Sequence, residues 1–159
     1  MEPRIDYTKY AQDAQKSLYA LEKYLATCGL DRKLIHLLKM RASQINGCAF
    51  CIDMPSKDAR ALGETEQRLY ELNAWRETPF YTEKERAALE WTEAVTLVSE
   101  THVPDEAFEQ LKKHFSDKEI VDLTLLVAII NAWNRLAISV RTVPGTYQPK
   151  HAATSAASS

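Results

Sequence analysis

Apolar residues recur along most of this chain at steps of three and four residues, the spacing that places them on one face of an α-helix. The pattern is clear from Tyr7 to Leu25 and from Leu34 to Ile45, whereas strand-like alternation is scarce. Helices are predicted at residues 6–26, 31–46, 48–63, 64–75, 82–100, 103–114 and 116–140. The sequence therefore predicts an all-α, single-domain helical bundle of about six or seven helices, spanning residues 1–145.

The last predicted helix, residues 116–140, has a different pattern from the others. It opens with Ser116 and Glu119, the spacing of a capping box at a helix start. From Leu123 to Ile130 nearly every position is apolar, which leaves no polar face for solvent. A helix of this kind is normally buried, so we expect it at the centre of the bundle or in a subunit contact.

Composition narrows the class of protein. The chain has 159 residues, of which 45% are hydrophobic and 26% charged, and its net charge of -2 gives no reason to expect a nucleic acid or an acidic membrane as partner. No apolar run reaches membrane-spanning length, and residues 1–4 do not open a signal peptide. Three cysteines, an odd number, argue against a secreted disulfide framework and predict a cytoplasmic protein. Residues 146–159 become rich in Ala, Ser and Thr and are predicted to form a disordered tail.

The strongest chemical signal is a C-x-x-C pair, Cys48 and Cys51, which directly follows Asn46 and Gly47. Asn-Gly is a helix stop, so one helix is expected to end there and another to begin at Cys48. A spacing of three places both sulfurs on one face of the first turn, where the helix dipole favours thiolates. The pair is therefore expected to be a redox-active dithiol or half of a metal site.

Three other interpretations of the motif are less well supported. A thioredoxin places this motif in a βαβ unit, and no strand is predicted here. A zinc site needs two further ligands, but the four histidines form no spaced pair and no second C-x-x-C exists, so neither a metal nor a cofactor is expected. Two inert buried cysteines remain the plainest alternative, although a helix-opening turn is an unusual place for them.

Pro55 lies four residues after Cys51 and leaves two interpretations open. If the helix begins near Cys48, Pro55 is interior, and its ring removes the hydrogen bond to the Cys51 carbonyl. If the cysteines lie on a separate short turn, the regular helix starts at Asp53 or Met54, with Pro55 in its first turn.

His36 lies off the apolar stripe of its helix, which is typical of a solvated surface residue. However, if the helices before and after Gly47 form a hairpin, His36 should face residues 55–57, about one turn beyond Cys51. A neutral imidazole in that place could accept the thiol proton directly or through water. His36 is thus a candidate base for the cysteine pair.

The other residues with chemical potential have structural interpretations. Cys28 is expected to be a small buried hydrophobe. Asn131, Asn134 and Arg135 are expected to form a hydrogen-bond network where the last helix packs. The tryptophans are expected in the core and two histidines on the surface: Trp75, Trp91 and Trp133, with His102 and His114.

The segment from Arg41 to Met54, Arg-Ala-Ser-Gln-Ile-Asn-Gly-Cys-Ala-Phe-Cys-Ile-Asp-Met, resembles the alkylhydroperoxidase-like, or carboxymuconolactone decarboxylase, family. The similarity extends to residues 61–63, 75–80 and 83–91 and to the apolar last helix, so that it covers roughly residues 5–143. This combined pattern is far more specific than a bare C-x-x-C.

The resemblance implies an all-α cytoplasmic antioxidant protein that assembles as a homo-oligomer, a trimer or hexamer. In peroxidase members, a Glu and a His four residues after the second Cys relay a proton. Carried over, Cys51 would attack a hydroperoxide and Cys48 would close the disulfide. This chain has His36 at the Glu position and Pro55 at the His position, so the relay is at best half present.

Three functional hypotheses follow from these residues. The first is a thiol peroxidase, weakened by Pro55, in which Cys51, Cys48 and His36 act on a hydroperoxide and an external dithiol reductant or adaptor protein restores the thiols. The second is a non-catalytic, oligomeric helical protein that binds a ligand or acts as a scaffold. The third is a lactone decarboxylase, as the family's other name suggests, although that chemistry needs no cysteine pair.

Overall fold

The computed structural model describes residues 1–149, and every regular element in that range is helical, as predicted. There are eight α-helices and two 3-10 segments among these residues. In chain order they are η1 (Tyr7–Lys9), α1 (Gln12–Leu25), α2 (Arg32–Asn46), α3 (Ala49–Ala61), α4 (Glu66–Tyr70), η2 (Leu72–Glu77), α5 (Glu83–Thr96), α6 (Val98–Thr101), α7 (Asp105–Lys112) and α8 (Asp117–Val140).

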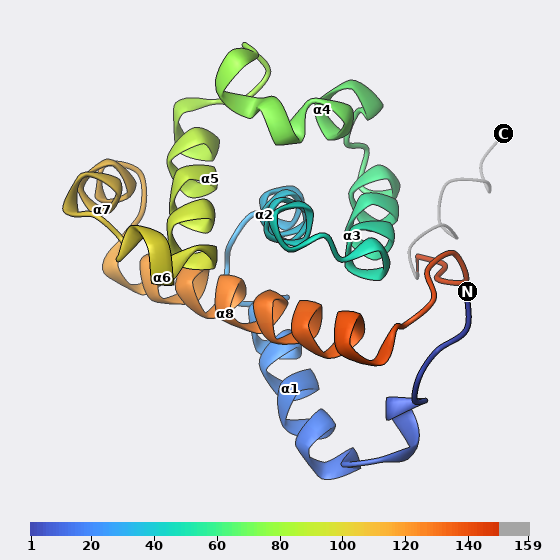
Figure 1. The fold of residues 1–159 in the computed structure, drawn as a ribbon. Helices are drawn as coiled ribbons and strands as arrows, with labels where there is room; N and C mark the ends of the chain where they lie inside the picture. Colours follow the sequence, from blue (N-terminus) through green and yellow to red (C-terminus); the bar gives the residue numbers. More distant parts are fainter. Residues whose placement is uncertain (150–159) are drawn as a thin grey trace, which may run out of the picture.

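Helix α2 lies at the centre of the molecule. In Figure 1 it is seen nearly end-on, with α3, the α4–η2 segment, α5 and α8 arranged around it. Apolar side chains on several sides of α2 are buried, among them Leu37 and Leu38, and each such leucine contributes about 1.5–3 kcal/mol to folding. The cysteine pair follows directly on this central helix, so the core fixes its position.

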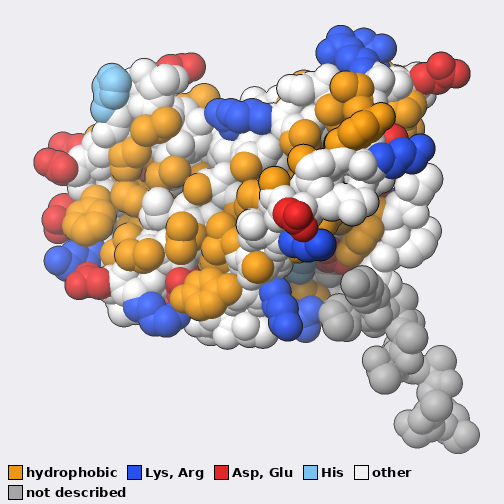
Figure 2. All heavy atoms as spheres, turned by 90° about the horizontal axis from the view of Figure 1, so that it is seen from below, with side chains coloured by type: hydrophobic (Ala, Val, Ile, Leu, Met, Phe, Trp, Pro, Cys, Tyr) orange, Lys and Arg blue, Asp and Glu red, His pale blue; other side chains and the backbone are white. Residues whose placement is uncertain are grey.

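Helix α8 begins at the predicted capping box, but the expectation that it lies at the centre is only half right, and the alternative, a subunit contact, stays a prediction. One side packs against α2 and α5, while Val121 is 58% exposed and Leu125 36% exposed on the other. Figure 2 views the molecule from the side of α1 and α8, and hydrophobic side chains gather over much of this face. The expectation that no apolar run reaches membrane-spanning length is not met by α8, whose length and hydropathy would allow it to span a membrane. A core helix passes the same test, so this is weak evidence.

Three predicted helices are interrupted, which explains the larger number of helices. The segment 6–26 is broken because Ala11 has a left-handed backbone (φ 49°), so that α1 begins only at Gln12. The segment 64–75 divides into α4 and η2, and the segment 82–100 divides at Leu97 into α5 and α6. Apolar spacing continues through all three breaks, so periodicity alone could not reveal them.

After α8 the chain turns at Arg141 and runs against α3. We call residues 142–149 the C-terminal strap. Lys57 of α3 donates hydrogen bonds to the carbonyl oxygens of Gly145 and Tyr147, at 3.4 Å and 3.1 Å. The tail expected at residues 146–159 therefore begins with residues that contact α3, and its remainder, 150–159, lies outside the described residues.

Candidate redox site at the start of α3

The turn between α2 and α3 forms where the sequence predicts it. Gly47 follows Asn46 with a φ of +69°, a left-handed conformation that glycine adopts without strain. The next residue, Cys48, donates its N–H to the Ser43 carbonyl at 3.0 Å and is the N-cap of α3. The tight reversal thus places the first cysteine at the start of a helix.

Cys48 and Cys51 form a disulfide, with a Cα–Cα distance of 5.2 Å that lies within the usual range for such bonds. The Cys48 sulfur also accepts a hydrogen bond from the Cys51 N–H at 3.4 Å. The two cysteines are only 2% and 5% exposed and belong to a small buried cluster with Ala42, Ile130 and Ala137, against which Phe50 and Trp133 pack. The cysteine pair is therefore shielded from solvent.

A polar network fixes this turn to α8. The Asn46 amide group donates to the side-chain oxygens of Asn131, at 3.0 Å, and Asn134, at 2.8 Å. Asn134 is fully buried and donates to the Ser43 hydroxyl at 2.9 Å, while Arg135 donates to Asn131. The predicted hydrogen-bond network is confirmed, and its role is to hold the end of α2.

Pro55 is buried in the interior of α3, which confirms the first of the two interpretations. The helix runs from Ala49 to Ala61 as one element, with Cys48 as its cap. Proline has no N–H, so it cannot supply the usual hydrogen bond to the Cys51 carbonyl. Position 55 thus presents neither a proton donor nor an acceptor beside the cysteine turn.

His36 is partly buried, so the expectation of a solvated surface residue is wrong. Its Nδ1 is buried without a hydrogen-bond partner among residues 1–149. Burial lowers the pKa of His36 to about 4; the Asp58 and Glu22 carboxylates oppose this effect, and Lys39 and Arg32 add to it. The imidazole is therefore neutral near pH 7, which is the form that accepts a proton.

The helix expected to face His36 does pack against α2, and the charged residue it supplies is Asp58. Asp58 in turn accepts a hydrogen bond from the Tyr147 hydroxyl at 2.7 Å. The sequence pattern indicated neither residue. Asp58 lies three residues after Pro55, on the same side of α3, which could have indicated it. Tyr147 falls in the segment expected to be disordered, and no local signal marks it.

The remaining sequence predictions have mixed outcomes. Trp75 and Trp91 are buried as predicted, while Trp133 is only partly buried and packs against Tyr19 with a centroid distance of 5.2 Å. Cys28 is likewise only partly buried. His102 is exposed as predicted, but His114 is partly buried.

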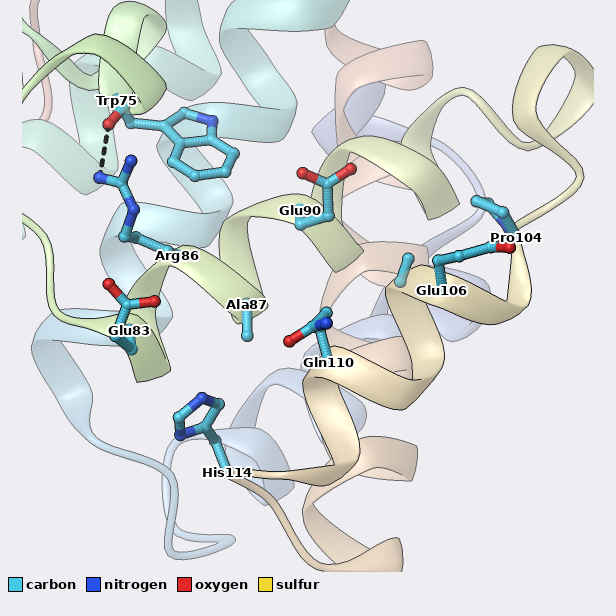
Figure 3. Close-up of a pocket in the computed structure, with 10 residues that line it drawn as sticks. Trp75, Glu83, Arg86, Ala87, Glu90, Pro104, Glu106, Gln110 and His114 are labelled. Atoms are coloured by element: carbon cyan, nitrogen blue, oxygen red, sulfur yellow. Dashed lines mark hydrogen bonds between the residues drawn. The ribbon is translucent and has the colours of Figure 1, made fainter.

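His114 lines a cavity of about 280 Å³ between α5 and α7, shown in Figure 3. Glu83, Arg86 and Glu90 of α5 also line it, and Glu106 and Gln110 come from α7. No cysteine belongs to this cavity, so it is separate from the redox pair. Within residues 1–149, no three His, Cys, Asp or Glu side chains lie close enough to share a metal ion.

The all-helical fold and the C-x-x-C pair at a helix start define the class of protein. The profile of the carboxymuconolactone decarboxylase family matches residues 12–94, and the chain belongs to this family. An uncharacterized Bacillus subtilis protein, YdfG, is 44% identical over 140 residues, which cover 88% of this chain and 95% of that protein.

Solved structures support the same assignment. A protein of unknown function from Agrobacterium tumefaciens, provisionally described as the antioxidant defence protein AhpD, is 49% identical. Its TM-score is 0.88, and the match covers 92% of this chain and all (100%) of that one. The debrominase Bmp8 shares the fold with a TM-score of 0.76 at 22% identity, over 85% of this chain and 73% of its own.

The Asn46 network should be important for stability. Replacing Asn134 by Ala leaves the buried Ser43 hydroxyl without its donor and removes one of the two acceptors of the Asn46 amide, and we expect a loss of about 2–3 kcal/mol in the free energy of unfolding. Urea unfolding of the oxidised protein measures this loss. Arg135→Ala is the control, since Arg135 is exposed and should cost well under about 1 kcal/mol. Equal losses in both variants would contradict a structural role for the network.

The buried His36 should make the fold sensitive to acid. Its folded pKa of about 4 lies below the ordinary value of 6.5, so the unfolded chain binds the proton first as the pH falls. The stabilising contribution is fully present above pH 6.5 and is lost as the pH falls toward 4. Between these values, wild type should lose about 2 kcal/mol more stability than His36→Gln. Urea titrations across this range would contradict the idea if both proteins gave the same slope.

Proposed function

We propose that this protein is a thiol peroxidase that reduces hydroperoxides through Cys48 and Cys51. The observation that carries the proposal is the disulfide at the N-terminus of α3, beside a helix that presents a neutral imidazole. Membership of the family and the 49% identical AhpD-like structure support this class of activity.

In the proposed reaction, His36 accepts the proton of the Cys51 thiol, directly or through water. The Cys51 thiolate attacks one hydroperoxide oxygen, the O–O bond breaks, and the released alkoxide takes up the proton to leave as an alcohol. Cys51 is then a sulfenic acid, and the Cys48 thiolate attacks its sulfur and expels water. One hydroperoxide and two thiols thus give an alcohol, water and a disulfide.

The start of α3 suits both sulfurs for this sequence of steps. Cys51 lies in the first turn, where the helix dipole stabilises negative charge. The N–H of Cys51 points to the Cys48 sulfur and would favour the Cys48 thiolate that resolves the sulfenic acid. The lack of a titratable group at Pro55 leaves His36 as the base and is expected to make turnover slow.

Reduction of the disulfide needs an external dithiol or an adaptor protein. Both cysteines are almost fully buried, so the reductant needs a local opening of the cluster that holds them. We further propose that the protein works in the cytoplasm, where dithiol reductants are available. We also propose that it is a homo-oligomer, a trimer or hexamer, whose subunits meet through the apolar outer face of α8.

A second candidate function is a non-catalytic binding or scaffold protein. The observation in its favour is the burial of both sulfurs, since inert structural cysteines are typically buried. Lactone decarboxylation ranks third because the family's name alone suggests it.

The first experiment follows disulfide formation by intact mass after the reduced protein receives one equivalent of an organic hydroperoxide. Cys51→Ser should abolish peroxide consumption. Pro55→His should speed disulfide formation by about 10- to 100-fold, because it adds a second imidazole near the thiol.

Pro55→Ala is the matched control for this variant, since it restores the backbone N–H without adding an imidazole. It should react at about the wild-type rate. If Cys51→Ser consumes peroxide as fast as wild type, or if neither wild type nor Pro55→His forms the disulfide, the binding or scaffold function replaces the peroxidase.

The assembly has a separate test. Leu125→Glu places a charge on the exposed face of α8 and should shift the protein from oligomer to monomer in size-exclusion chromatography with light scattering. Tyr70→Glu is the control, because Tyr70 is 71% exposed on α4 and should leave the assembly unchanged. A monomeric wild type would refute the α8 contact.

A further inference from the structure

The C-terminal strap reaches one carboxylate of α3 that lies 89 positions earlier in the chain. The Tyr147 hydroxyl donates to Oδ1 of Asp58 at 2.7 Å. Burial and this hydrogen bond raise the pKa of the Tyr147 hydroxyl well above its ordinary value, so it remains a donor at any physiological pH. A charged acceptor makes such a bond about twice as strong as a neutral one, so it can fix the Asp58 side chain.

The strap is held in place independently of Asp58. The Gly145 N–H donates to Oδ2 of Asp53 at 3.2 Å, and Lys57 donates to the Gly145 and Tyr147 carbonyl oxygens. Lys57 also pairs with Asp53 at 2.9 Å. Tyr147 therefore meets Asp58 from a backbone that two other α3 residues already position.

Asp58 is also the carboxylate that most strongly favours the protonated form of His36. The other charged groups near this imidazole are Lys39 and Arg32 of α2 and Glu22 of α1. Glu22 is already engaged, since it accepts hydrogen bonds from Lys39 and from the indole N–H of Trp133. By contrast, no cation pairs with Asp58 among residues 1–149.

We propose that Asp58 and Tyr147 are positioning residues of the redox site: Tyr147 holds the Asp58 carboxylate, and Asp58 stabilises the imidazolium that His36 forms on accepting the Cys51 proton. This proposal rests on the peroxidase function above. The proton moves from the Cys51 sulfur to an imidazole nitrogen and then to the departing alkoxide. Asp58 takes up no proton in these steps, and the Tyr147 hydroxyl keeps its own.

The physical need for such a carboxylate is clear at this position. Burial opposes charge on His36, and two neighbouring cations oppose it further. Without the Asp58 carboxylate, the imidazole would be a still weaker base for a thiol. A carboxylate behind a catalytic histidine, which stabilises the imidazolium without taking its proton, solves the same problem in hydrolase triads.

The test measures two quantities on the reduced protein. One is the pKa of His36, from an NMR titration of its ring protons. The other is the rate of disulfide formation with one equivalent of an organic hydroperoxide, followed by intact mass. Asp58→Asn should lower the His36 pKa by about one pH unit and slow disulfide formation about 10- to 100-fold. Tyr147→Phe should slow disulfide formation about fivefold. The double variant with Asp58→Asn and Tyr147→Phe should react no more slowly than Asp58→Asn alone.

Asp53→Asn is the matched control, because it removes a negative charge that is not among the groups that act on His36, while the Asn side-chain oxygen can still accept the Gly145 N–H and Lys57 still donates to the strap. It should leave both quantities close to wild type. In a His36→Gln background, Asp58→Asn should no longer slow the reaction, whereas a merely structural role would slow it to the same extent as before.

The outcomes separate this proposal from the peroxidase function. If Asp58→Asn leaves the His36 pKa and the rate unchanged, or if Asp53→Asn has the same effect, the positioning role is wrong. If wild type does not react with hydroperoxide, the peroxidase function fails, and with it the positioning role in thiol chemistry. A fall in the His36 pKa together with slower oxidation supports the proposal.

Discussion

The turn between α2 and α3 is the constraint on which the site depends. Gly47 lets the backbone reverse in a left-handed conformation, and the Asn46 side chain holds the end of α2 to Asn131 and Asn134 of α8. Cys48 consequently becomes the cap of α3, and Cys51 lies within its first turn. Because α2 also packs against α3, α5 and α8, the geometry of the cysteine pair is set by the whole core.

Burial governs the chemistry available at this turn. It keeps His36 neutral and removes the cysteines from solvent, so the same packing that leaves the imidazole unprotonated also shields the cysteine pair. The strap reaches the same region, since Tyr147 donates a hydrogen bond to Asp58, the carboxylate that opposes the lowering of the His36 pKa. In the proposed mechanism, this contact would link the position of the strap to the basicity of His36.

This chain differs from the family's proton relay at two positions, 36 and 55. The resemblance leads one to expect a carboxylate at position 36, on α2, and an imidazole at position 55, on α3. This chain has His36 on α2, and the carboxylate that acts on it, Asp58, lies on α3. A carboxylate and an imidazole are thus both present, but the imidazole lies on α2 and the carboxylate on α3, the reverse of the family's arrangement. Pro55 occupies the position where the family has its imidazole.

Local signals in the sequence were enough for the fold class and for the cysteine turn. Asn46 and Gly47 stop one helix and C-x-x-C opens the next, and the capping boxes at Thr82 and Ser116 start α5 and α8, because each depends only on residues a few positions apart. The family assignment also followed from a contiguous segment around the cysteines, and the comparisons confirm it.

Contacts between distant parts of the chain decided the rest. The burial of His36, the central place of α2 rather than α8, and the bond between Tyr147 and Asp58 arise from packing that joins residues up to about 90 positions apart. Periodicity describes one element at a time, so it cannot tell which neighbour covers a polar residue or whether a terminal segment finds a partner. Only the assembled tertiary structure brings His36, Asp58 and the strap together.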